Sequence, residues 1–287
     1  MDIYQMITDR IIADLQKGTI PWEKPWINTS GTNVSRSHID GRVYSLLNQM
    51  MLGIPGEYVT FKQAQKEGGH IKKGAKSKQV FFFKMIEKKD SATDEEKLVP
   101  FLRYSSVFHI EDAENIAPKF VFSKGDAYNN VNNEEIDKAV QDYLTRSGVT
   151  LRLYEQNKSF YSPSEDEIIL PHMNQFVNSE SYYATLFHEM GHSTGAANRL
   201  DRQICNPFGS KAYSREELVA EITSAVLCNR FGIDTEKINR NTSAYVQSWL
   251  KVLSEDSKAV VWAAGRAEKA VKMILNEKDT AEEEAAA

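Results

Sequence analysis

The chain has 287 residues, a formal net charge of -5 at pH 7, 41% hydrophobic residues and 26% charged residues. This composition excludes a fibrous or largely disordered protein, and the length allows two domains that each bury a core. No stretch is long and apolar enough for a transmembrane helix, and the N-terminus lacks the pattern of a signal peptide. Two cysteines, Cys205 and Cys228, are too few for a disulfide framework. We expect a soluble, cytoplasmic protein with no membrane partner.

The first half of the chain predicts an α+β domain over residues 1 to 124. Apolar residues at helical spacing predict an amphipathic helix over residues 3 to 17, which Gly18 ends. Two Pro-Trp pairs follow, in which Trp22 and Trp26 place large aromatic surfaces near a lysine. The later elements are a strand at 58 to 61, a helix at 61 to 67, a basic turn at 68 to 74, and strands at 79 to 84 and 101 to 108 flanking a charged loop at 87 to 97.

Positive charge is concentrated in the first half of the chain. Residues 62 to 89 contain nine lysines, among them Lys72, Lys73, Lys76 and Lys78, but only two acidic residues. Lysines beside exposed aromatic rings are typical of single-stranded nucleic-acid binding, where rings stack on bases and ammonium groups contact phosphates. The composition supports a second interpretation equally well, in which the lysines form a solvated charged face and both tryptophans pack in a core.

The second half predicts a domain over residues 133 to 278, after a polar linker at 125 to 132. A low-complexity tail at 279 to 287 is predicted to be disordered. The expected elements are a helix at 134 to 147, a turn and short strand at 162 to 171, and helices around the metal motif and at 214 to 231, 243 to 253 and 257 to 275. We expect this domain to be mostly helical with a small sheet.

The most specific motif is His188-Glu189-Met190-Gly191-His192. On a helix, residues four apart lie on one face, so both imidazoles can reach one metal ion. Ser181 is suited to the N-cap of this helix, and Gly195 stands where it should end. Glu189 can then take a proton from the attacking water, as the general base of a zinc peptidase. The motif predicts a catalytic Zn2+ site, for which Mn2+ and Co2+ remain alternatives.

A catalytic zinc ion needs a third protein ligand. The metzincin pattern fails, because Asn198 stands where its third histidine would be. Ser214 and Glu217 match a capping box, which gives Glu217 a structural role. Glu221, one turn later, points toward the core by periodicity, and a buried carboxylate requires a partner. We therefore expect Glu221 to be the third ligand, with Glu217, Glu216 and His172 as alternatives.

Several motifs occur in one order along most of the chain: residues 18 to 26, Leu47-Asn48, residues 60 to 64, Gly68-Gly69, Lys73-Gly74, residues 166 to 171, residues 188 to 195 and residues 216 to 221. With these motifs the chain resembles the ArdC-type antirestriction proteins of conjugative plasmids and other mobile elements. The resemblance implies an N-terminal domain that binds single-stranded DNA and a C-terminal zincin-like metallopeptidase domain.

By motif position, the resemblance also implies DNA-binding roles for a set of N-terminal residues. Tyr58 departs from the pattern, since it stands where the family has a tryptophan. The function implied is protection of single-stranded DNA, or of the duplex made from it, against host restriction enzymes, with an unknown protein as peptidase substrate. The residues concerned are Trp22, Trp26, Asn48, Tyr58, Lys72 and Lys73.

Two other functional classes remain open from the sequence. The metal site could be purely structural in a DNA-binding protein, or the chain could be an intracellular zinc protease whose lysines are only solvated. Peptide hydrolysis also needs a donor for the developing oxyanion, and Tyr161, Tyr182 and Tyr183 are candidates between which the sequence does not choose.

Overall fold

The computed structural model describes residues 2–23, 34–89, 96–120, 133–156, 158–202, 204, 210–235, 238 and 242–278. The linker expected at 125–132, the tail at 279–287 and Trp26 lie outside these residues. Within the described chain, no helix combines the length and the apolar character needed to cross a membrane. The α+β class predicted from the sequence is confirmed, with strands concentrated in the first half and helices in the second.

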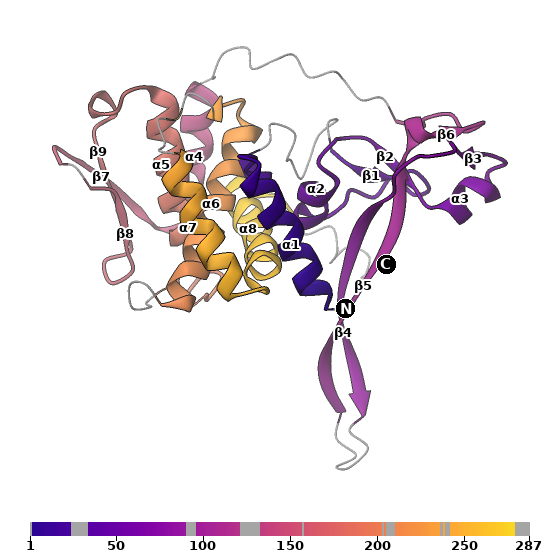
Figure 1. Cartoon of the computed structure of the whole chain (residues 1–287). Coiled ribbons are helices and arrows are strands. Elements are labelled where there is room, and N and C mark those ends of the chain that lie inside the picture. Colours follow the sequence, from indigo (N-terminus) through magenta and orange to yellow (C-terminus); the bar gives the residue numbers. More distant parts are fainter. Residues whose placement is uncertain are drawn as a thin grey trace.

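The N-terminal half forms short helices around a sheet of order β1-β2-β5-β4, with a separate β3-β6 pair (Figure 1). The strands β4 and β5 pair antiparallel as a long hairpin that extends beyond the rest of the domain (Figure 1). The two strands run further than expected, because residues 87–89 and 96–97, which were expected in the charged loop, take part in the ladder. The elements are α1 (Ile3–Gln16), η1 (Pro21–Glu23), β1 (Arg36–Ser37), α2 (Leu46–Leu52), β2 (Glu57–Val59), α3 (Phe61–Lys66), β3 (His70–Ile71), β4 (Lys78–Lys89), β5 (Glu96–His109), η2 (Ile110–Asp112) and β6 (Ala113–Glu114).

The C-terminal half is a helical bundle with a three-stranded sheet at one side (Figure 1). In that sheet β9 is central, parallel to β7 and antiparallel to β8. The elements are α4 (Asn133–Ser147), β7 (Thr150–Tyr154), β8 (Phe160–Ser162), β9 (Glu167–Pro171), η3 (Met173–Gln175), α5 (Ser179–Ser193), α6 (Lys211–Arg230), α7 (Thr242–Glu255) and α8 (Ala259–Leu275).

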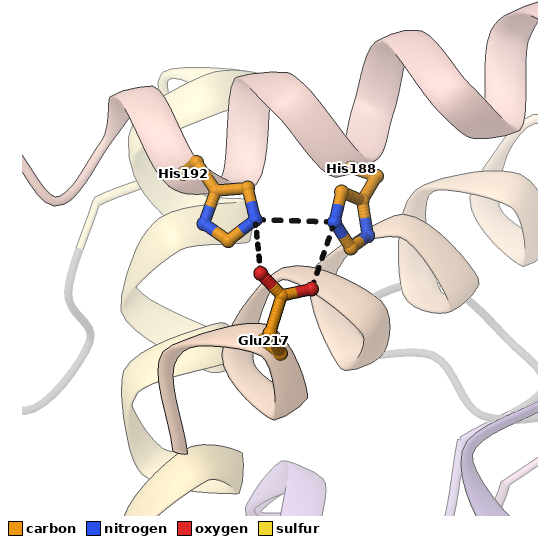
Figure 2. A group of neighbouring side chains, drawn as sticks. All are labelled: His188, His192 and Glu217. Carbon is orange, nitrogen blue, oxygen red and sulfur yellow. Dashed lines mark hydrogen bonds and ion pairs between the residues drawn. The ribbon is translucent and has the colours of Figure 1, made fainter. Parts of the chain in front are cut away.

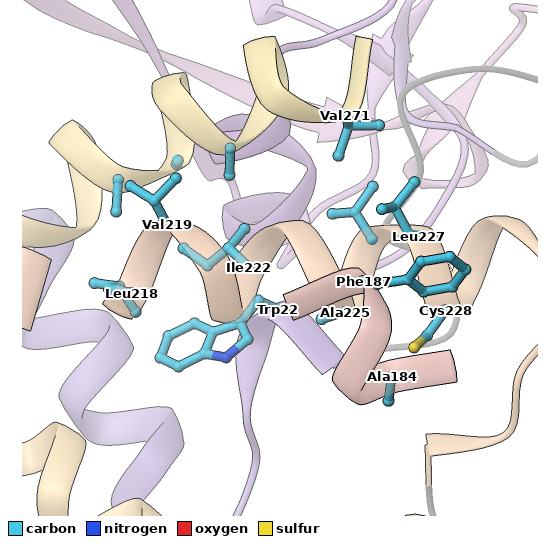
Figure 3. Close-up of a cluster of buried hydrophobic side chains, with 14 of the residues drawn as sticks. Trp22, Ala184, Phe187, Leu218, Val219, Ile222, Ala225, Leu227, Cys228 and Val271 are labelled. Atoms are coloured by element: carbon cyan, nitrogen blue, oxygen red, sulfur yellow. The ribbon is translucent and has the colours of Figure 1, made fainter. Parts of the chain in front are cut away.

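One hydrophobic core joins the two halves of the chain. Ile7, Ile11 and Leu15 recur at helical spacing on α1 and are buried in the same cluster as residues of α6, α7 and α8. Trp22 of η1 is fully buried and meets Trp249 edge to face, with ring centroids 6.2 Å apart. Figure 3 shows the Trp22 indole beside Leu218 and Ile222 of α6. The first helix and the segment after it are therefore packed on the C-terminal bundle.

Candidate metal centre

Helix α5 carries both histidines of the central motif. It begins at Ser179, because the side chain of Asn178 accepts a hydrogen bond from the backbone N–H of Ser181 at 2.8 Å. The expected cap, Ser181, is therefore one of the first helical residues. Helical spacing then brings His188 and His192 together, with their Nε2 atoms 3.1 Å apart.

Helix α6 lies close against α5 at a glycine. A Cβ added to Gly191 would lie only 3.1 Å from the Cα of Ala220 and 3.3 Å from the Cβ of Thr223. Ser224 of α6 also donates a hydrogen bond to the carbonyl of Ala184 at 2.7 Å. The missing side chain at Gly191 therefore permits the close approach that brings carboxylates of α6 to the two histidines.

Three side chains from these helices converge: His188, His192 and Glu217, whose candidate ligand atoms all lie within 4.8 Å of one another (Figure 2). The Glu217 carboxylate oxygens lie 3.6 Å from Nε2 of His188 and 3.5 Å from Nε2 of His192. Around a tetrahedral ion with bonds of about 2.1 Å, ligand atoms are about 3.4 Å apart. The donor set and its spacing therefore fit a zinc-type ion.

Glu221 approaches the His188 imidazole on the side opposite to Glu217. Its carboxylate lies 3.7 Å from Nδ1 of His188, the nitrogen that faces away from the cluster. Glu216 takes the equivalent place at His192, 3.3 Å from Nδ1, and is held by Arg202 at 2.7 Å. A carboxylate in such a position orients a metal-bound histidine. His172 lies exposed at the start of η3 and takes no part in the cluster.

The charges within the cluster shift the pKa values of His188 and Glu217. Burial alone would lower the pKa of His188, but the hydrogen bond to Glu217 and the charges of Glu221 and Glu189 outweigh it and raise the pKa to about 9. Burial would likewise raise the pKa of Glu217, but its hydrogen bond to His188 and the charge of His192 bring it to about 2. This surplus of carboxylates suits the centre to a divalent cation.

Two further groups lie close enough to act on the cluster. Glu189 is only 6% exposed, and its charge contributes to the raised pKa of His188. Burial, a hydrogen bond to Glu217 and the charges of Glu217 and Glu189 raise the pKa of Tyr213 to about 12. Tyr213 was not identified from the sequence, because the predicted helix began after it.

The three tyrosines considered from the sequence have other partners. The hydroxyl of Tyr161 donates to Asp166 at 2.5 Å, and that of Tyr183 donates to Asp137 at 2.9 Å. Tyr182 is buried and packs edge to face on the rings of Phe176 and Tyr183. Among these three tyrosines and Tyr213, it is Tyr213 that forms a hydrogen bond with a residue of the cluster, Glu217.

The N-terminal residues considered for DNA contacts divide by burial. Trp22, Asn48 and Tyr58 are buried; the Asn48 amide exchanges two hydrogen bonds with the backbone of Phe81, at 2.7 and 2.8 Å, and the Tyr58 hydroxyl donates to the carbonyl of Ile54. These side chains hold the N-terminal half together. A base could stack on the Trp22 indole only if that residue left the core.

The lysines near β3 and β4 are on the surface. Lys72, Lys73 and Lys76 are exposed in the turn between the two strands. The ammonium group of Lys72 donates to the carbonyl of Glu111 at 2.7 Å, and that of half-buried Lys78 donates to the carbonyl of Leu52. The turn therefore presents a group of exposed cations. These lysines are more than 100 residues before the metal cluster in the sequence.

Comparison with known proteins identifies both halves. A family model described as a zincin-like metallopeptidase matches residues 138–266, and the N-terminal domain of anti-restriction factor ArdC matches residues 1–108. Crystal structures of the antirestriction protein ArdC from plasmid R388, metal-free and Mn(II)-bound, give TM-scores of 0.71 and 0.72. They are 32% and 31% identical, and the match covers 96% of this chain and 98% of theirs.

Longer relatives contain the same unit. A DNA primase TraC of Escherichia coli is 33% identical over 95% of this chain, yet the chain spans only 27% of that protein. A second TraC of Escherichia coli is 32% identical, and the chain spans 20% of it. The two family matches in this order, together with a fold shared over nearly the whole length, show that the chain belongs to the ArdC family of antirestriction proteins.

Proposed function

We propose that this chain is an antirestriction protein of a mobile element, which binds single-stranded DNA and protects incoming DNA from host restriction enzymes. The likeness to ArdC over 96% of the chain carries the proposal, because it includes both domains and their order. Duplex DNA made from the incoming strand is a second partner that we propose. Since incoming DNA meets restriction enzymes inside the recipient cell, the proposed site of action is the cytoplasm.

We further propose that the metal centre is a zinc metallopeptidase-type site with His188, His192 and Glu217 as ligands. The distances between their ligand atoms support this set over one containing Glu221, whose carboxylate approaches the opposite nitrogen of His188. When bound there, a divalent ion supplies Lewis-acid polarisation of a peptide carbonyl and of the attacking water. Mn2+ is the alternative ion, since an ArdC structure is described as Mn(II)-bound.

Three residues of this chain would have separate roles in hydrolysis. Glu189, buried next to His188 on α5, would accept a proton from the attacking water and return it to the leaving amine. The Tyr213 hydroxyl, adjacent to Glu217, would donate to the oxygen on which negative charge develops. Glu216, fixed by Arg202, would hold the His192 ring in orientation through Nδ1.

The experiment that tests the peptidase proposal compares wild type with Glu189→Gln on a library of unlabelled peptides, read by mass spectrometry. Loss of the proton acceptor should abolish cleavage while the bound metal, measured by elemental analysis, stays at the wild-type amount. Equal cleavage by both proteins would rule out Glu189 as general base. If metal-loaded wild type cleaves nothing and loses stability on chelation, the site is structural.

The proposed DNA contacts of the N-terminal half are the exposed lysines Lys72, Lys73 and Lys76. Their charges suit phosphate groups, and such binding weakens steeply as salt rises. The test is the affinity of the full chain for a labelled single strand over a range of salt concentrations. Affinity that is independent of salt, or absent at low salt, would refute the DNA-binding proposal and favour an intracellular protease.

A further inference from the structure

A large cleft separates the N-terminal sheet from the last helix of the bundle. Its volume is about 1290 Å³, which exceeds the range of about 300 to 1,000 Å³ that is usual for small-molecule pockets. The cleft lies apart from the metal cluster, none of whose three residues lines it. Its size therefore fits an extended ligand better than a single small molecule.

The two walls come from different halves of the chain. One wall is formed mainly by the loop before α2 and by residues of β4 and β5, and the other mainly by α8 and the turn at Leu200. Helices α2 and α8 lie side by side (Figure 1), and Glu268 of α8 accepts a hydrogen bond from the backbone N–H of Leu46 at 3.1 Å. This bond and the packing of α2 against α8 connect the two walls.

The lining carries a surplus of positive charge. Six cationic side chains and three carboxylates line the cleft. Arg42 pairs with Asp40 at 3.2 Å, Arg202 pairs with Glu216 outside the lining at 2.7 Å, and Glu268 pairs with Lys272 at 3.6 Å, which leaves four lining cations beside Asp201. The cations are Arg42, Arg103, Arg202, Lys258, Arg266 and Lys269, and the carboxylates are Asp40, Asp201 and Glu268. Walls with such an excess attract a polyanion.

Arg266 is the cation best placed to hold an anion. Its guanidinium stacks on the Trp262 ring at 3.9 Å, and Nη1 donates to the carbonyl of Trp262 at 3.3 Å. Burial, followed by the like charges of Arg202 and Arg215, lowers the pKa of Arg266. A phosphate bound here would offset that repulsion and accept the remaining guanidinium hydrogens.

Apolar side chains line the cleft beside these cations. Ile39, Val43 and Phe82 are among the exposed large hydrophobic residues, and the Phe82 ring is 39% exposed beneath the guanidinium of Arg103 at 5.8 Å. Aromatic and aliphatic surfaces next to cations match unpaired bases joined by phosphates. A duplex would offer only its phosphates to such walls, because its bases are paired and stacked inside.

A glycine on the α8 wall is unexplained by packing within the protein. Gly265 lies in the middle of α8 and lines the cleft, and a Cβ added to it would meet no atom of the described residues within 4 Å. Glycine is a poor helix former, so its presence weakens this helix. An absent side chain at this position leaves room for a ligand to contact the helix closely.

We propose that this cleft holds a short stretch of single-stranded DNA, with phosphates contacting Arg103, Arg266 and Lys269 and a base lying on Phe82. The last helix of the metallopeptidase domain is then half of the DNA-binding site. The inference rests on the proposed DNA-binding function and specifies where that function is carried out.

The test measures the binding of a fluorescent thymidine oligonucleotide by the full chain, using anisotropy. The double variant Arg103→Gln/Lys269→Gln changes one exposed cation on each wall. We expect its affinity to fall at least tenfold, and the slope of log affinity against log salt to decrease by about 0.7 for each phosphate that the variant no longer neutralises. Lys138→Gln/Lys251→Gln removes the same charge from exposed positions outside the cleft and should bind as wild type.

A second pair of variants tests the space above α8. Gly265→Ala adds one methyl group, which meets no atom of the described residues, and should weaken oligonucleotide binding far less than a larger, charged side chain. Gly265→Glu places a carboxylate in the path of the phosphates and should lose binding, while circular dichroism shows both proteins folded. Equal binding by Gly265→Glu and Gly265→Ala would overturn the proposal.

The outcomes separate this inference from the function on which it rests. If wild type fails to bind at low salt, the DNA-binding function and the cleft are both refuted. If wild type binds and the cleft variants bind equally well, DNA binding stands and the cleft is refuted; a Lys72→Gln/Lys73→Gln/Lys76→Gln variant then tests the β3–β4 turn. A duplex that binds as tightly as the single strand, with the same losses, overturns the assignment to a single strand.

Discussion

The identification of the third metal ligand from the sequence depends on where α6 begins. From the sequence, Ser214 was expected to be the N-cap and Glu217 to belong to a capping box, but the cap is Ser210, whose hydroxyl accepts from the backbone N–H of Tyr213 at 3.1 Å. Glu217 therefore has no capping role and reaches both histidines. Ser210 is as good a capping residue as Ser214, so the sequence alone did not distinguish the two starts.

Exchange of each carboxylate for an amide tests the ligand assignment. Glu217→Gln should remove a ligand and lose most of the zinc affinity, whereas Glu221→Gln and Glu216→Gln, which change groups that only orient a histidine, should lose about 10- to 100-fold. Competition against a chromophoric chelator measures each affinity. A larger loss for Glu221→Gln than for Glu217→Gln would restore Glu221 as the ligand.

A second prediction concerns a carboxylate outside the metal centre. Hydrogen bonds from Arg199 and Tyr161, at 3.0 and 2.5 Å, hold the pKa of Asp166 below its usual value. A carboxylate with a depressed pKa contributes stability above its unfolded pKa of about 3.9, and this contribution is lost as pH falls through the folded pKa. The stability difference between wild type and Asp166→Asn should therefore shrink on acidification.

Urea unfolding from neutral pH to below the pKa of Asp166 measures that difference. Glu165→Gln is the matched control, because Glu165 is an exposed neighbour, and it should change stability little at any pH. A difference for Asp166→Asn that stays constant or grows on acidification would show that the Arg199 contact does not favour the ionised carboxylate.

Two glycines in helices differ in what surrounds them, which gives opposite predictions. At Gly191 an added Cβ would press on the backbone of α6, so Gly191→Ala should destabilise by about 1 to 3 kcal/mol through overpacking. At Gly265 the space is open, so Gly265→Ala should stabilise by about 0.5 to 1 kcal/mol through better helix propensity. Urea denaturation measures both effects. A stabilising Gly191→Ala would contradict the packing of α5 on α6, and a destabilising Gly265→Ala would contradict the open space at Gly265.

At the scale of elements, the positions of most helices and strands could be predicted from local patterns. The helices expected at 3 to 17, 61 to 67 and 134 to 147 are present within a residue at each end, because their periodicity and flanking residues are local signals. The start of α5 was misplaced, since Asn178 and Ser181 are both capping residues and the choice depends on the chain before them.

At the scale of the whole molecule, the packing of the two halves could not be predicted from the sequence. Trp22 has the character expected of a surface for stacking bases, but tertiary contacts with Trp249 and with α6 bury it. The cleft likewise combines residues 82, 103 and 266, which are close only after folding. Local patterns contain no information on such long-range contacts.

The buried position of Trp22 predicts a role in stability. Trp22→Ala should lower the free energy of unfolding by about 3 to 5 kcal/mol, the usual loss for removing a large aromatic side chain from a core. Phe61→Ala, at a residue that is 50% exposed, should cost far less. Urea unfolding compares the two variants, and similar small losses for both would mean that η1 is not packed on the bundle.

The most direct test of the central claim, that the chain protects incoming DNA by binding it, is the survival of unmodified DNA transferred into a restricting host. Wild type and Lys138→Gln/Lys251→Gln should raise survival, while Arg103→Gln/Lys269→Gln, folded and loaded with metal to the same extent, should lose protection. Survival with wild type equal to that in a host lacking the chain would contradict the central claim, whereas full protection by the Arg103→Gln/Lys269→Gln variant would refute only the cleft as the DNA site.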